Sequence, residues 1–335
     1  MERDFTFRDG ERTIRFAAGA VEESAGLLAG HGFEGYALLT TERASADAPA
    51  VVAGADAVLH LPQGPVPEIA AAVRSGVEGR PVVALGGGRV VDAAKAIASA
   101  DDLRCAAIPT TLAGSSFTPF HRLPAPLEGY GFVRPALVVA DPDLMASLPE
   151  QQLAATAMNA LAHASESLYA PGANPVAEGA ALRAAELFAS GLAPGELRRA
   201  ELALAALLGG WEVGTTGLSL HHAVCQTIVR TAGTPHALTN AVMLPHTLRF
   251  MAGRAPDELR KLARALRSES REPEEAGDAV APLAARSGAT RLGDLDLDAG
   301  AIPAIVRAAL QHPGIAAMHP APAEAEIRDL LEAAL

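Results

Sequence analysis

The stretch VVALGGGRVVDAAKAIA (Val82–Ala98) decides the fold, because it places three glycines between an apolar run and a helical pattern. Val82–Leu85 is short and wholly apolar, as a buried parallel strand requires. Gly86, Gly87 and Gly88 have no Cβ, so the backbone can approach a phosphate there. The helix that follows would direct its free N–H groups and its positive dipole end at that anion. The stretch predicts a phosphate-binding strand–loop–helix unit, although its spacing differs from G-x-G-x-x-G.

Short apolar runs alternate with helical patterns on both sides of this unit, through residue 148. Helical patterns such as Ala20–Ala29 and Val66–Ser75 lie between the runs. Strands that are apolar on both faces must be covered on both faces, so we predict a parallel sheet between two layers of helices. The predicted strands are Tyr36–Thr40, Ala57–Leu61, Val82–Leu85, Cys105–Pro109 and Leu137–Ala140, with Arg12–Phe16 as an added edge strand.

The pattern changes at Pro149. Long stretches rich in alanine and leucine follow, and proline and glycine punctuate them as they do helix ends. The chain is therefore predicted to have two domains, an α/β domain over residues 1–148 and an all-helical domain over residues 149–335. The clearest helical stretches are Gln151–Tyr169, Pro175–Ser190, Leu197–Val213, Pro256–Arg267 and Pro322–Leu335.

Composition excludes several classes of protein. The formal net charge of −12 over 335 residues, without a basic stripe, argues against nucleic-acid binding. No apolar run approaches the roughly 20 residues of a membrane span. The start, MERDFTFRDG, is too charged for a signal peptide. Only Cys105 and Cys225 are present and form no disulfide framework. We expect a cytoplasmic enzyme, and a small anionic substrate remains compatible with the charge.

Polar residues beside the glycines leave several interpretations open. Arg89 could bind phosphate through two hydrogen bonds, reach a 2′-phosphate, or point into solvent. Asp92 and Lys95 form either a surface pair or a pair that orders the loop. The loop Pro109–Ser116 follows the strand Cys105–Pro109 and carries four hydroxyls. These hydroxyls suit diphosphate or ribose contacts. The alternative is an ordinary loop of serine and threonine residues that binds no ligand.

Blocks along the whole chain resemble the iron-containing alcohol dehydrogenase superfamily, and most closely its maleylacetate reductase branch. The blocks are GGGRVVDAAKAIA (86–98), IPTTLAGSSFTP (108–119), DPDLMASLP (141–149), MNALAHASESLYAPGANP (158–175), PHALTNAVMLPH (235–246) and HPAPAEAEIRDLLEAAL (319–335). The resemblance implies a dehydroquinate synthase-like fold. Its Rossmann-like amino-terminal domain would bind a nicotinamide nucleotide. The active site would lie in the cleft between this domain and the helical domain. It also implies a homodimer.

The same resemblance implies an NAD(P)H-dependent oxidoreductase that reduces an oxo acid or an enone-type carboxylate. NADH or NADPH would be the cofactor. The residues that would line it are Thr40, Thr41, Gly86, Gly87, Gly88, Arg89, Asp92, Lys95, Thr110, Thr111 and Ser115.

Four positions match the aspartate and three histidines that hold the metal in metal-dependent members of the superfamily: Asn159, His163, His222 and His236. Residues 159 and 163 are i and i+4, so they share a helix face. Asn159 removes the one anionic ligand, although three imidazoles alone can hold zinc. The maleylacetate reductase branch also has asparagine here and is regarded as acting without a metal. We predict a metal-independent enzyme whose histidines polarise the substrate oxygen and deliver a proton.

Other residues depart from the maleylacetate reductase pattern. Gln226 stands where that branch has a histidine near the nicotinamide, and Arg230 replaces a glycine. Arg122, beside His121, occupies a turn that is more apolar in the branch. We predict that the two arginines, with His121, bind the carboxylate of the substrate.

These departures leave two other function classes open. One is a non-redox enzyme of a specialised pathway, catalysing proton transfer, dehydration or cyclisation on the same fold. The other is a binding or regulatory protein with a degenerate site, in which the histidines are buried structural residues. The intact glycine loop and the presence of His222 and His236 favour the reductase.

Overall fold

The computed structural model describes residues 12–267 and 272–335. These residues separate into two compact units that divide after Leu148. Residues 1–11, which belong to the predicted first domain, lie outside the described residues. The roles assigned to the two domains, and the active site between them, stay predictions.

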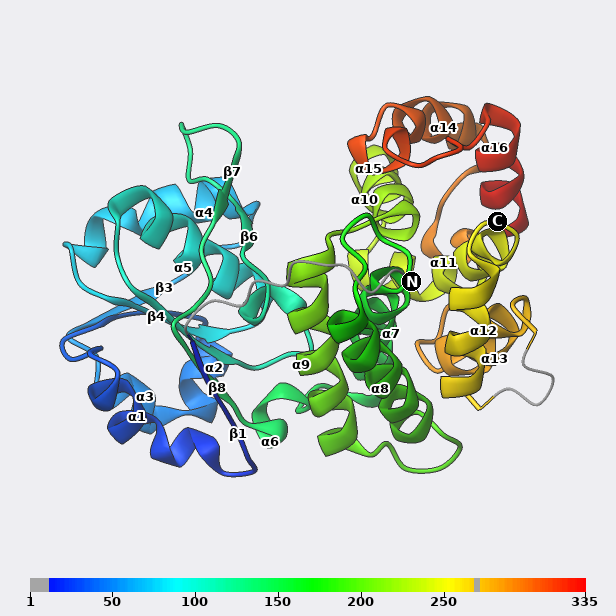
Figure 1. The fold of residues 1–335 in the computed structure, drawn as a ribbon. Coiled ribbons are helices and arrows are strands. Elements are labelled where there is room, and N and C mark those ends of the chain that lie inside the picture. Colours follow the sequence, from blue (N-terminus) through cyan, green and yellow to red (C-terminus); the bar gives the residue numbers. More distant parts are fainter. Residues whose placement is uncertain (1–11, 268–271) are drawn as a thin grey trace. The chain divides into compact units, whose positions relative to one another are not determined.

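A six-stranded parallel sheet forms the centre of residues 12–148 (Figure 1). Its strand order is β1-β8-β5-β4-β2-β3, and every neighbouring pair runs parallel. The predicted parallel sheet, its edge strand included, is confirmed, and each strand ends within one residue of its prediction. The strands are β1 Thr13–Phe16, β2 Ala37–Thr40, β3 Ala57–His60, β4 Val82–Gly86, β5 Cys105–Pro109 and β8 Leu137–Ala140.

Helices cover both faces of this sheet, as Figure 1 shows. Alternate residues of a strand point to opposite faces. Val82 and Ala84 therefore join the apolar core on one face, whereas Val83 and Leu85 join the core on the other. The first face is covered by α4 (Val66–Val73) and α5 (Gly88–Asp101), and the second by α1 (Ser24–Gly30), α2 (Glu42–Asp47) and α3 (Pro49–Ala53). The short helix α6 (Pro142–Met145) ends the unit.

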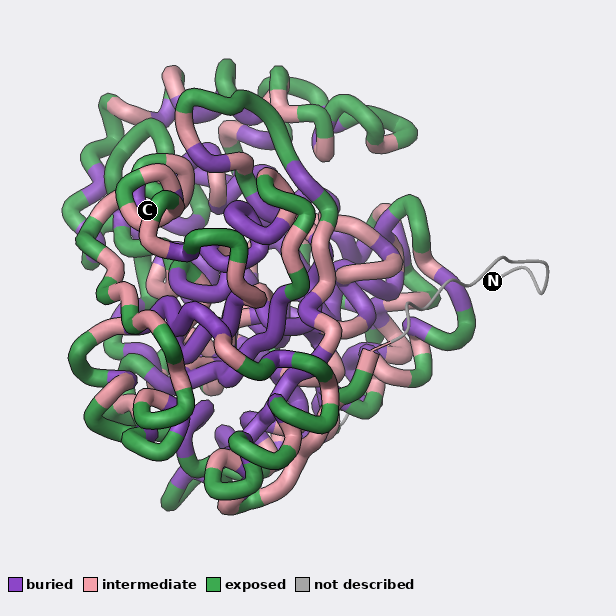
Figure 2. The backbone as a smooth tube through the Cα atoms, turned by 90° about the vertical axis from the view of Figure 1, so that its left-hand side faces the viewer, coloured by how far each residue is buried: buried purple, intermediate pink, exposed green. Residues whose placement is uncertain are grey.

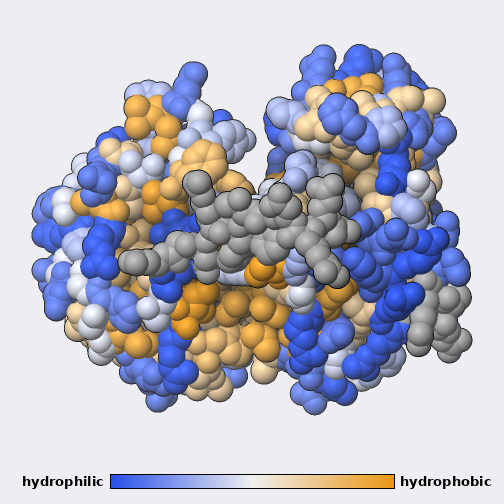
Figure 3. Space-filling view, viewed as in Figure 1, coloured by the Kyte–Doolittle hydropathy of each residue, from blue (hydrophilic) through white to orange (hydrophobic). Residues whose placement is uncertain are grey.

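A small hairpin corrects the sequence prediction for Phe120–Arg122. This segment is not a turn but strand β6, paired antiparallel with β7 (Tyr130–Phe132). The rings of Phe120 and Phe132 meet edge to face, with centroids 5.9 Å apart. Phe132 and Leu127 are nevertheless exposed, and Figure 3 shows hydrophobic atoms gathered over the hairpin.

The described residues beyond 148 contain helices and no strand. None of their helices is long and apolar enough to cross a membrane. Figure 2 shows buried residues toward the inside and exposed residues on loops and on the outward-facing sides of helices. The helices are α7 Glu150–Ser167, α8 Pro175–Gly191, α9 Arg199–Thr216, α10 Leu220–Ala232, α11 His236–Ala252, α12 Pro256–Ala265, α13 Glu275–Ala285, α14 Ile302–Leu310, α15 Pro313–Ala316 and α16 Glu324–Ala333.

Helix α7 is the central element of the helical unit. It packs against α8, α9 and α11, and most of its residues from Leu153 onward are buried. Its small side chains let α9 approach closely: a Cβ added to Gly209 would lie 2.9 Å from the carbonyl oxygen of Ala160. Such a contact tolerates only glycine, so it fixes how α9 lies on α7. The rigid helix α7 is therefore a precise platform for side chains.

Candidate active site

Helix α7 presents Asn159, His163 and Glu166 at positions i, i+4 and i+7, which lie on one helix face. Helix α10 brings His222 against this face. The rings of His163 and His222 stack with centroids 4.5 Å apart and an interplanar angle of 23°. His236 begins α11, after Pro235 as its N-cap, and its charge acts on both of the other histidines. The structure thus gathers His163, His222 and His236 in one cluster, with Asn159 on the same face of α7 as His163.

Glu166 is the residue that the sequence analysis missed. Its Oε2 lies 2.6 Å from Nδ1 of His222, and its Oε1 accepts the backbone N–H of His222 at 3.3 Å. The carboxyl group is wholly buried and faces the first turn of α10, where free N–H groups favour a negative charge. The available signal was its position three residues after His163, on the face that carries Asn159.

Burial opposes charge on both members of the Glu166–His222 pair. It raises the pKa of Glu166, against the lowering effect of His221 and of the α10 backbone N–H groups. It lowers the pKa of His222 to about 3, and the charge of His236 lowers it further. The raised pKa of Glu166 favours the carboxylic acid over the carboxylate, and the lowered pKa of His222 favours the neutral ring over the imidazolium, so the proton of the pair is favoured on Glu166. Burial therefore helps the pair to keep one exchangeable proton at neutral pH.

Three buried polar atoms of the cluster have no hydrogen-bond partner among the described residues. They are Oδ1 of Asn159, Nδ1 of His163 and Nε2 of His222. Burial lowers the pKa of His163 well below its usual value, so this ring is neutral. Buried polar atoms are nearly always paired, so three unpaired ones together indicate a place where a ligand binds.

His221 supports the cluster as a structural residue. It is fully buried, with Nδ1 2.8 Å from the Thr247 hydroxyl and Nε2 3.0 Å from Oδ1 of Asn240. Asn240 also donates to the carbonyl oxygen of His236 at 2.8 Å. Both nitrogens of His221 are thus engaged, and the chain of contacts ties α10 to α11 beside the site.

The two predicted arginines lie in different units. Arg230 is exposed near the end of α10 and makes no ion pair or hydrogen bond with the described residues. Gln226 lies on the same helix, half-buried. Arg122 is exposed on the hairpin, whereas His121 is buried beneath it, and burial lowers the pKa of His121. Burial favours the neutral form of the His121 ring, so His121 adds no positive charge to the predicted anion site.

The name of the iron-containing alcohol dehydrogenases raises the question of a metal, and the donor set does not fit one. The described residues hold no group of three histidine, cysteine, aspartate or glutamate side chains arranged as metal ligands. Stacked rings direct their in-plane lone pairs alongside each other, so those of His163 and His222 do not converge on one ion. Asn159 supplies no anionic oxygen, which Fe²⁺ sites of the two-histidine–one-carboxylate type require.

The glycine loop of the first unit fits a diphosphate. Helix α5 begins after Gly87, and no side chain caps its first N–H groups. A Cβ on Gly87 would lie 3.1 Å from Cγ2 of Thr111, and one on Gly88 would lie 3.1 Å from Cβ of Ala113. The glycines thus allow the hydroxyl-rich loop to pack directly beside the uncapped helix end. Such an end binds phosphate through its free N–H groups.

Lys95 orders this hydroxyl-rich loop from beneath. Its ammonium is wholly buried and donates to the carbonyl oxygens of Ser115, Thr118 and Phe120 at 2.9, 3.2 and 2.7 Å. It also pairs with Asp92 at 2.8 Å, and the other oxygen of Asp92 accepts the Ser115 hydroxyl at 3.0 Å. Of the two interpretations of this pair, the loop-ordering one fits, and Lys95 has no surface to offer a ligand.

The other predicted nucleotide residues lie at the carboxyl ends of strands. Thr40 and Thr110 are buried, and Thr41 caps α2 through its side chain. Arg89 is exposed, and its Nη1 donates to Oε1 of Gln63 at 3.1 Å. The predicted contacts of these residues with a dinucleotide stay predictions.

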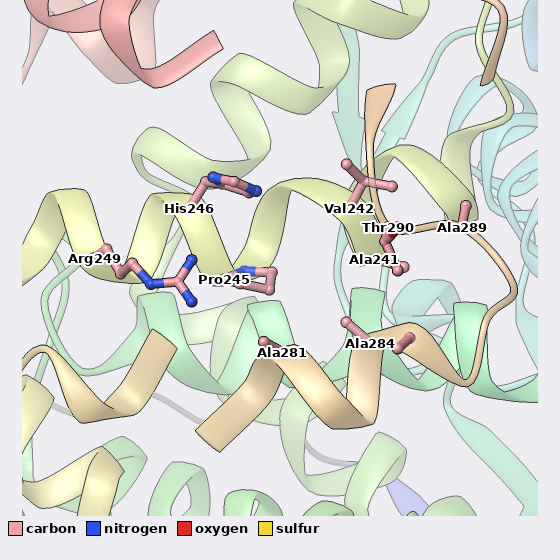
Figure 4. Close-up of a pocket in the computed structure, with 10 residues that line it drawn as sticks. Ala241, Val242, Pro245, His246, Arg249, Ala281, Ala284, Ala289 and Thr290 are labelled. Atoms are coloured by element: carbon pink, nitrogen blue, oxygen red, sulfur yellow. The ribbon is translucent and has the colours of Figure 1, made fainter. Parts of the chain in front are cut away.

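The helical unit contains a cavity that adjoins the cluster at Ser219, whose backbone N–H bonds to Glu166, and a smaller cavity elsewhere. One of about 690 Å³ is bordered by Tyr169, Ser219 and Arg254. One of about 120 Å³ lies between α11 and α13, where Figure 4 shows Ala281 and Ala284 opposite Pro245. Neither is lined by a predicted catalytic residue, so the unpaired polar atoms define the candidate site.

Glu212 is a second buried carboxyl group, and it has no partner. It lies on α9, fully buried, and neither of its oxygens has a hydrogen-bond partner among the described residues. Burial raises its pKa well above the usual 4.5. The destabilisation that Glu212 causes is therefore smallest below the unfolded-state pKa and grows as the pH rises toward the folded-state pKa.

We expect Glu212→Met to raise the free energy of unfolding by about 1–3 kcal/mol at pH 8, because it removes an unpaired buried polar group. The gain should be smaller at pH 5, where the unfolded chain keeps part of its carboxyl protonated. Denaturant unfolding at both pH values measures this. Glu186→Met, which alters an exposed carboxylate paired with Arg183, should have little effect. Equal gains at both pH values would contradict the assigned pKa shift.

Comparison with known proteins agrees with this architecture. The model of the C-terminal part of the Fe-containing alcohol dehydrogenase family matches residues 153–335, and an iron-containing alcohol dehydrogenase model matches residues 15–149. Maleylacetate reductase 1 of Rhodococcus opacus is 37% identical over 254 residues, 72% of this chain and 70% of that protein. The maleylacetate reductase of Sphingobium indicum is 35% identical over 271 residues, 76% and 77% of the two chains.

A solved structure extends the likeness to the whole chain. The crystal structure of maleylacetate reductase from Rhizobium sp. strain MTP-10005 has a TM-score of 0.88 at 29% identity and covers 100% of this chain and 99% of that chain. The chain belongs to the iron-containing alcohol dehydrogenase superfamily. Within that superfamily it lies in the maleylacetate reductase branch, and it is a maleylacetate reductase-like oxidoreductase.

Proposed function

We propose that the protein is a metal-independent NAD(P)H-dependent reductase of a small oxo acid with a conjugated double bond, of the kind that maleylacetate represents. The observation that carries this proposal is the buried Glu166–His222 pair, in which Nε2 of His222 has no hydrogen-bond partner among the described residues. Reduction of an enone by hydride also needs a proton, which must be delivered to a neighbouring atom of the substrate in the same active site. A buried pair that keeps one exchangeable proton supplies it.

The nucleotide would be held by the first unit. The uncapped first turn of α5 after Gly87 would bind the diphosphate, with Thr111 and Ser115 of the adjacent loop beside it. Bound NADH or NADPH supplies the hydride. Lys95 and Asp92 would act indirectly, by fixing the loop that carries these hydroxyls.

The proton would come from His222. In the net-neutral pair the proton lies between Oε2 of Glu166 and Nδ1 of His222, 2.6 Å apart, and Nε2–H can donate to the substrate. Donation leaves a proton on Nδ1 and a negative charge on Glu166. The backbone N–H of His222, at 3.3 Å, stabilises that charge. The unpaired Nδ1 of His163 would donate to the substrate oxygen, whereas the unpaired Oδ1 of Asn159 would accept a hydrogen bond from a substrate hydroxyl group.

Metal removal is expected to leave the reaction unchanged. Because the donor set does not converge and lacks an anionic oxygen, dialysis against a chelator should leave the reduction rate within about twofold of the untreated protein. Asn159→Asp restores the anionic ligand and should raise the zinc affinity measured by titration. Loss of activity on chelation, with recovery on adding Fe²⁺ or Zn²⁺, would overturn metal independence.

The first test of the reductase is a fluorescence titration of the chelated protein with NADH and NADPH, followed by nucleotide oxidation with maleylacetate. We expect saturable binding of one nucleotide and its oxidation by the substrate. Gly88→Val, whose Cβ would crowd Ala113 and Ser115, should abolish binding, whereas Gly26→Ala, on the exposed side of α1 with open space around it, should not. A folded wild-type protein that binds neither nucleotide would refute the proposal and favour the non-redox enzyme.

A further inference from the structure

Helix α10 carries one polar stripe that runs away from the Glu166–His222 pair. His222, Gln226 and Arg230 follow each other at i, i+4 and i+8, and Ala223 lies beside them. At 1.5 Å per residue, Arg230 begins about 12 Å along the axis from His222. The side chain of Arg230 can extend back along the helix toward His222. Its guanidinium and a short substrate can together span the distance between the two residues.

Helix α15 packs against this stripe and brings His312 to it. A Cβ on Gly314 would lie 3.4 Å from Cβ of Ala223 and 3.3 Å from Nδ1 of His312. His312 is the N-cap of α15, and its Nδ1 accepts the backbone N–H of Gly314 at 3.1 Å. Because Nδ1 is an acceptor, the neutral ring carries its proton on Nε2, which donates to no atom of the described residues.

The charges around His312 agree with this placement. Burial lowers the pKa of His312, the positive charge of Arg230 lowers it further, and the carboxylate of Glu166 opposes both effects. His312 therefore lies within electrostatic reach of Arg230 and of the Glu166–His222 pair. Arg230 itself has no carboxylate partner among the described residues.

We propose that Arg230 and the Nε2–H of His312 bind the second carboxylate of a dicarboxylate substrate, whose reacting end lies at His222. Two donors, one of them charged, form the strongest kind of hydrogen bond to a carboxylate. This inference rests on the proposed reductase and assigns two residues of this chain to the specificity of that site. It replaces the predicted anion site of Arg122, His121 and Arg230 with one built within the helical unit.

The test is calorimetric binding of two acids that differ by one carboxylate, 3-oxohexanedioate and 4-oxopentanoate. Arg230→Gln should weaken binding of the diacid about 10- to 100-fold and leave the monoacid unchanged. Arg307→Gln, on the exposed face of α14, removes the same charge elsewhere and should change neither. Equal losses for both acids, or no loss for the diacid, would overturn the proposal.

His312→Asn tests whether the His312 side chain binds the substrate, without removing the N-cap of α15. Asparagine is a preferred N-cap, so it keeps the cap of α15, but it is too short to place a donor where Nε2 lies. The diacid should again bind about tenfold more weakly, and the monoacid equally well. An unchanged diacid affinity would remove His312 from the site. Nucleotide oxidation is measured separately, so failure of reduction with intact discrimination between the acids would refute only the proposed function.

Discussion

Glu166→Gln is expected to lower kcat for reduction by about 10²- to 10⁴-fold, the usual contribution of a positioned proton donor. Glu166 offers two acceptor oxygens, one to the backbone N–H and one to Nδ1 of His222. An amide has one oxygen, so its NH₂ group must face either the backbone N–H or the ring. It also cannot exchange a proton with the ring. Steady-state kinetics and nucleotide titration measure the effect, and the nucleotide Kd should not change.

The pH profile separates a proton-transfer role from a structural one. Because burial raises the pKa of Glu166, the wild-type rate should fall as the pH rises through the pKa of the pair, since the proton is then lost. Glu166→Gln should remove this alkaline limb as well as lowering the rate. A variant with a near wild-type rate, or a slow variant that keeps the alkaline limb, would rule out the Glu166–His222 pair as the proton source.

Lys95→Met is expected to destabilise the protein by about 3–5 kcal/mol, the cost of leaving a largely buried ion pair without one partner. Three loop carbonyls lose their donor, and Asp92 loses its cation. The loop beside the glycines should then lose its order, so nucleotide affinity should fall as well. Denaturant unfolding and nucleotide titration of the same samples measure both effects.

The other lysine of the chain provides a matched control. Lys261 pairs with Glu178 at 2.9 Å, but its side chain is 34% exposed. Lys261→Met should cost about 1 kcal/mol or less, because exposed pairs contribute little. If the two substitutions cost the same, Lys95 does not organise the loop, and the nucleotide residues beside it need another support.

Those parts of the fold that follow from hydrophobic pattern could be read from the sequence. Val82–Gly86 and Leu137–Ala140 are strands that are buried on both faces. Short, wholly apolar runs of this kind predict inner strands of a parallel sheet. The hairpin at Phe120–Arg122 escaped prediction because its strands are three residues long and its partner strand exposes Tyr130 and Phe132. Short, exposed strands have no distinctive period of hydrophobic residues along the sequence.

The site was only partly readable for a different reason. Residues at i and i+4 lie on one face of any helix, so the placement of Asn159 beside His163 on α7 could be predicted. Glu166 looks like an ordinary helix-surface carboxylate until α10, 56 residues further on, places His222 against it. His312 joins the polar stripe only through the contact of Gly314 with Ala223. Such tertiary contacts leave no local signal in the chain.

The buried ammonium of Lys95 has a practical consequence for handling the protein. The chain has two lysines, and one of them is sealed from solvent. Amine-reactive dyes, cross-linkers and solid supports can therefore reach a single lysine side chain, Lys261 on α12. Once the α-amino group of the chain is blocked, a fluorophore placed on Lys261 would report on the helical unit from one known position.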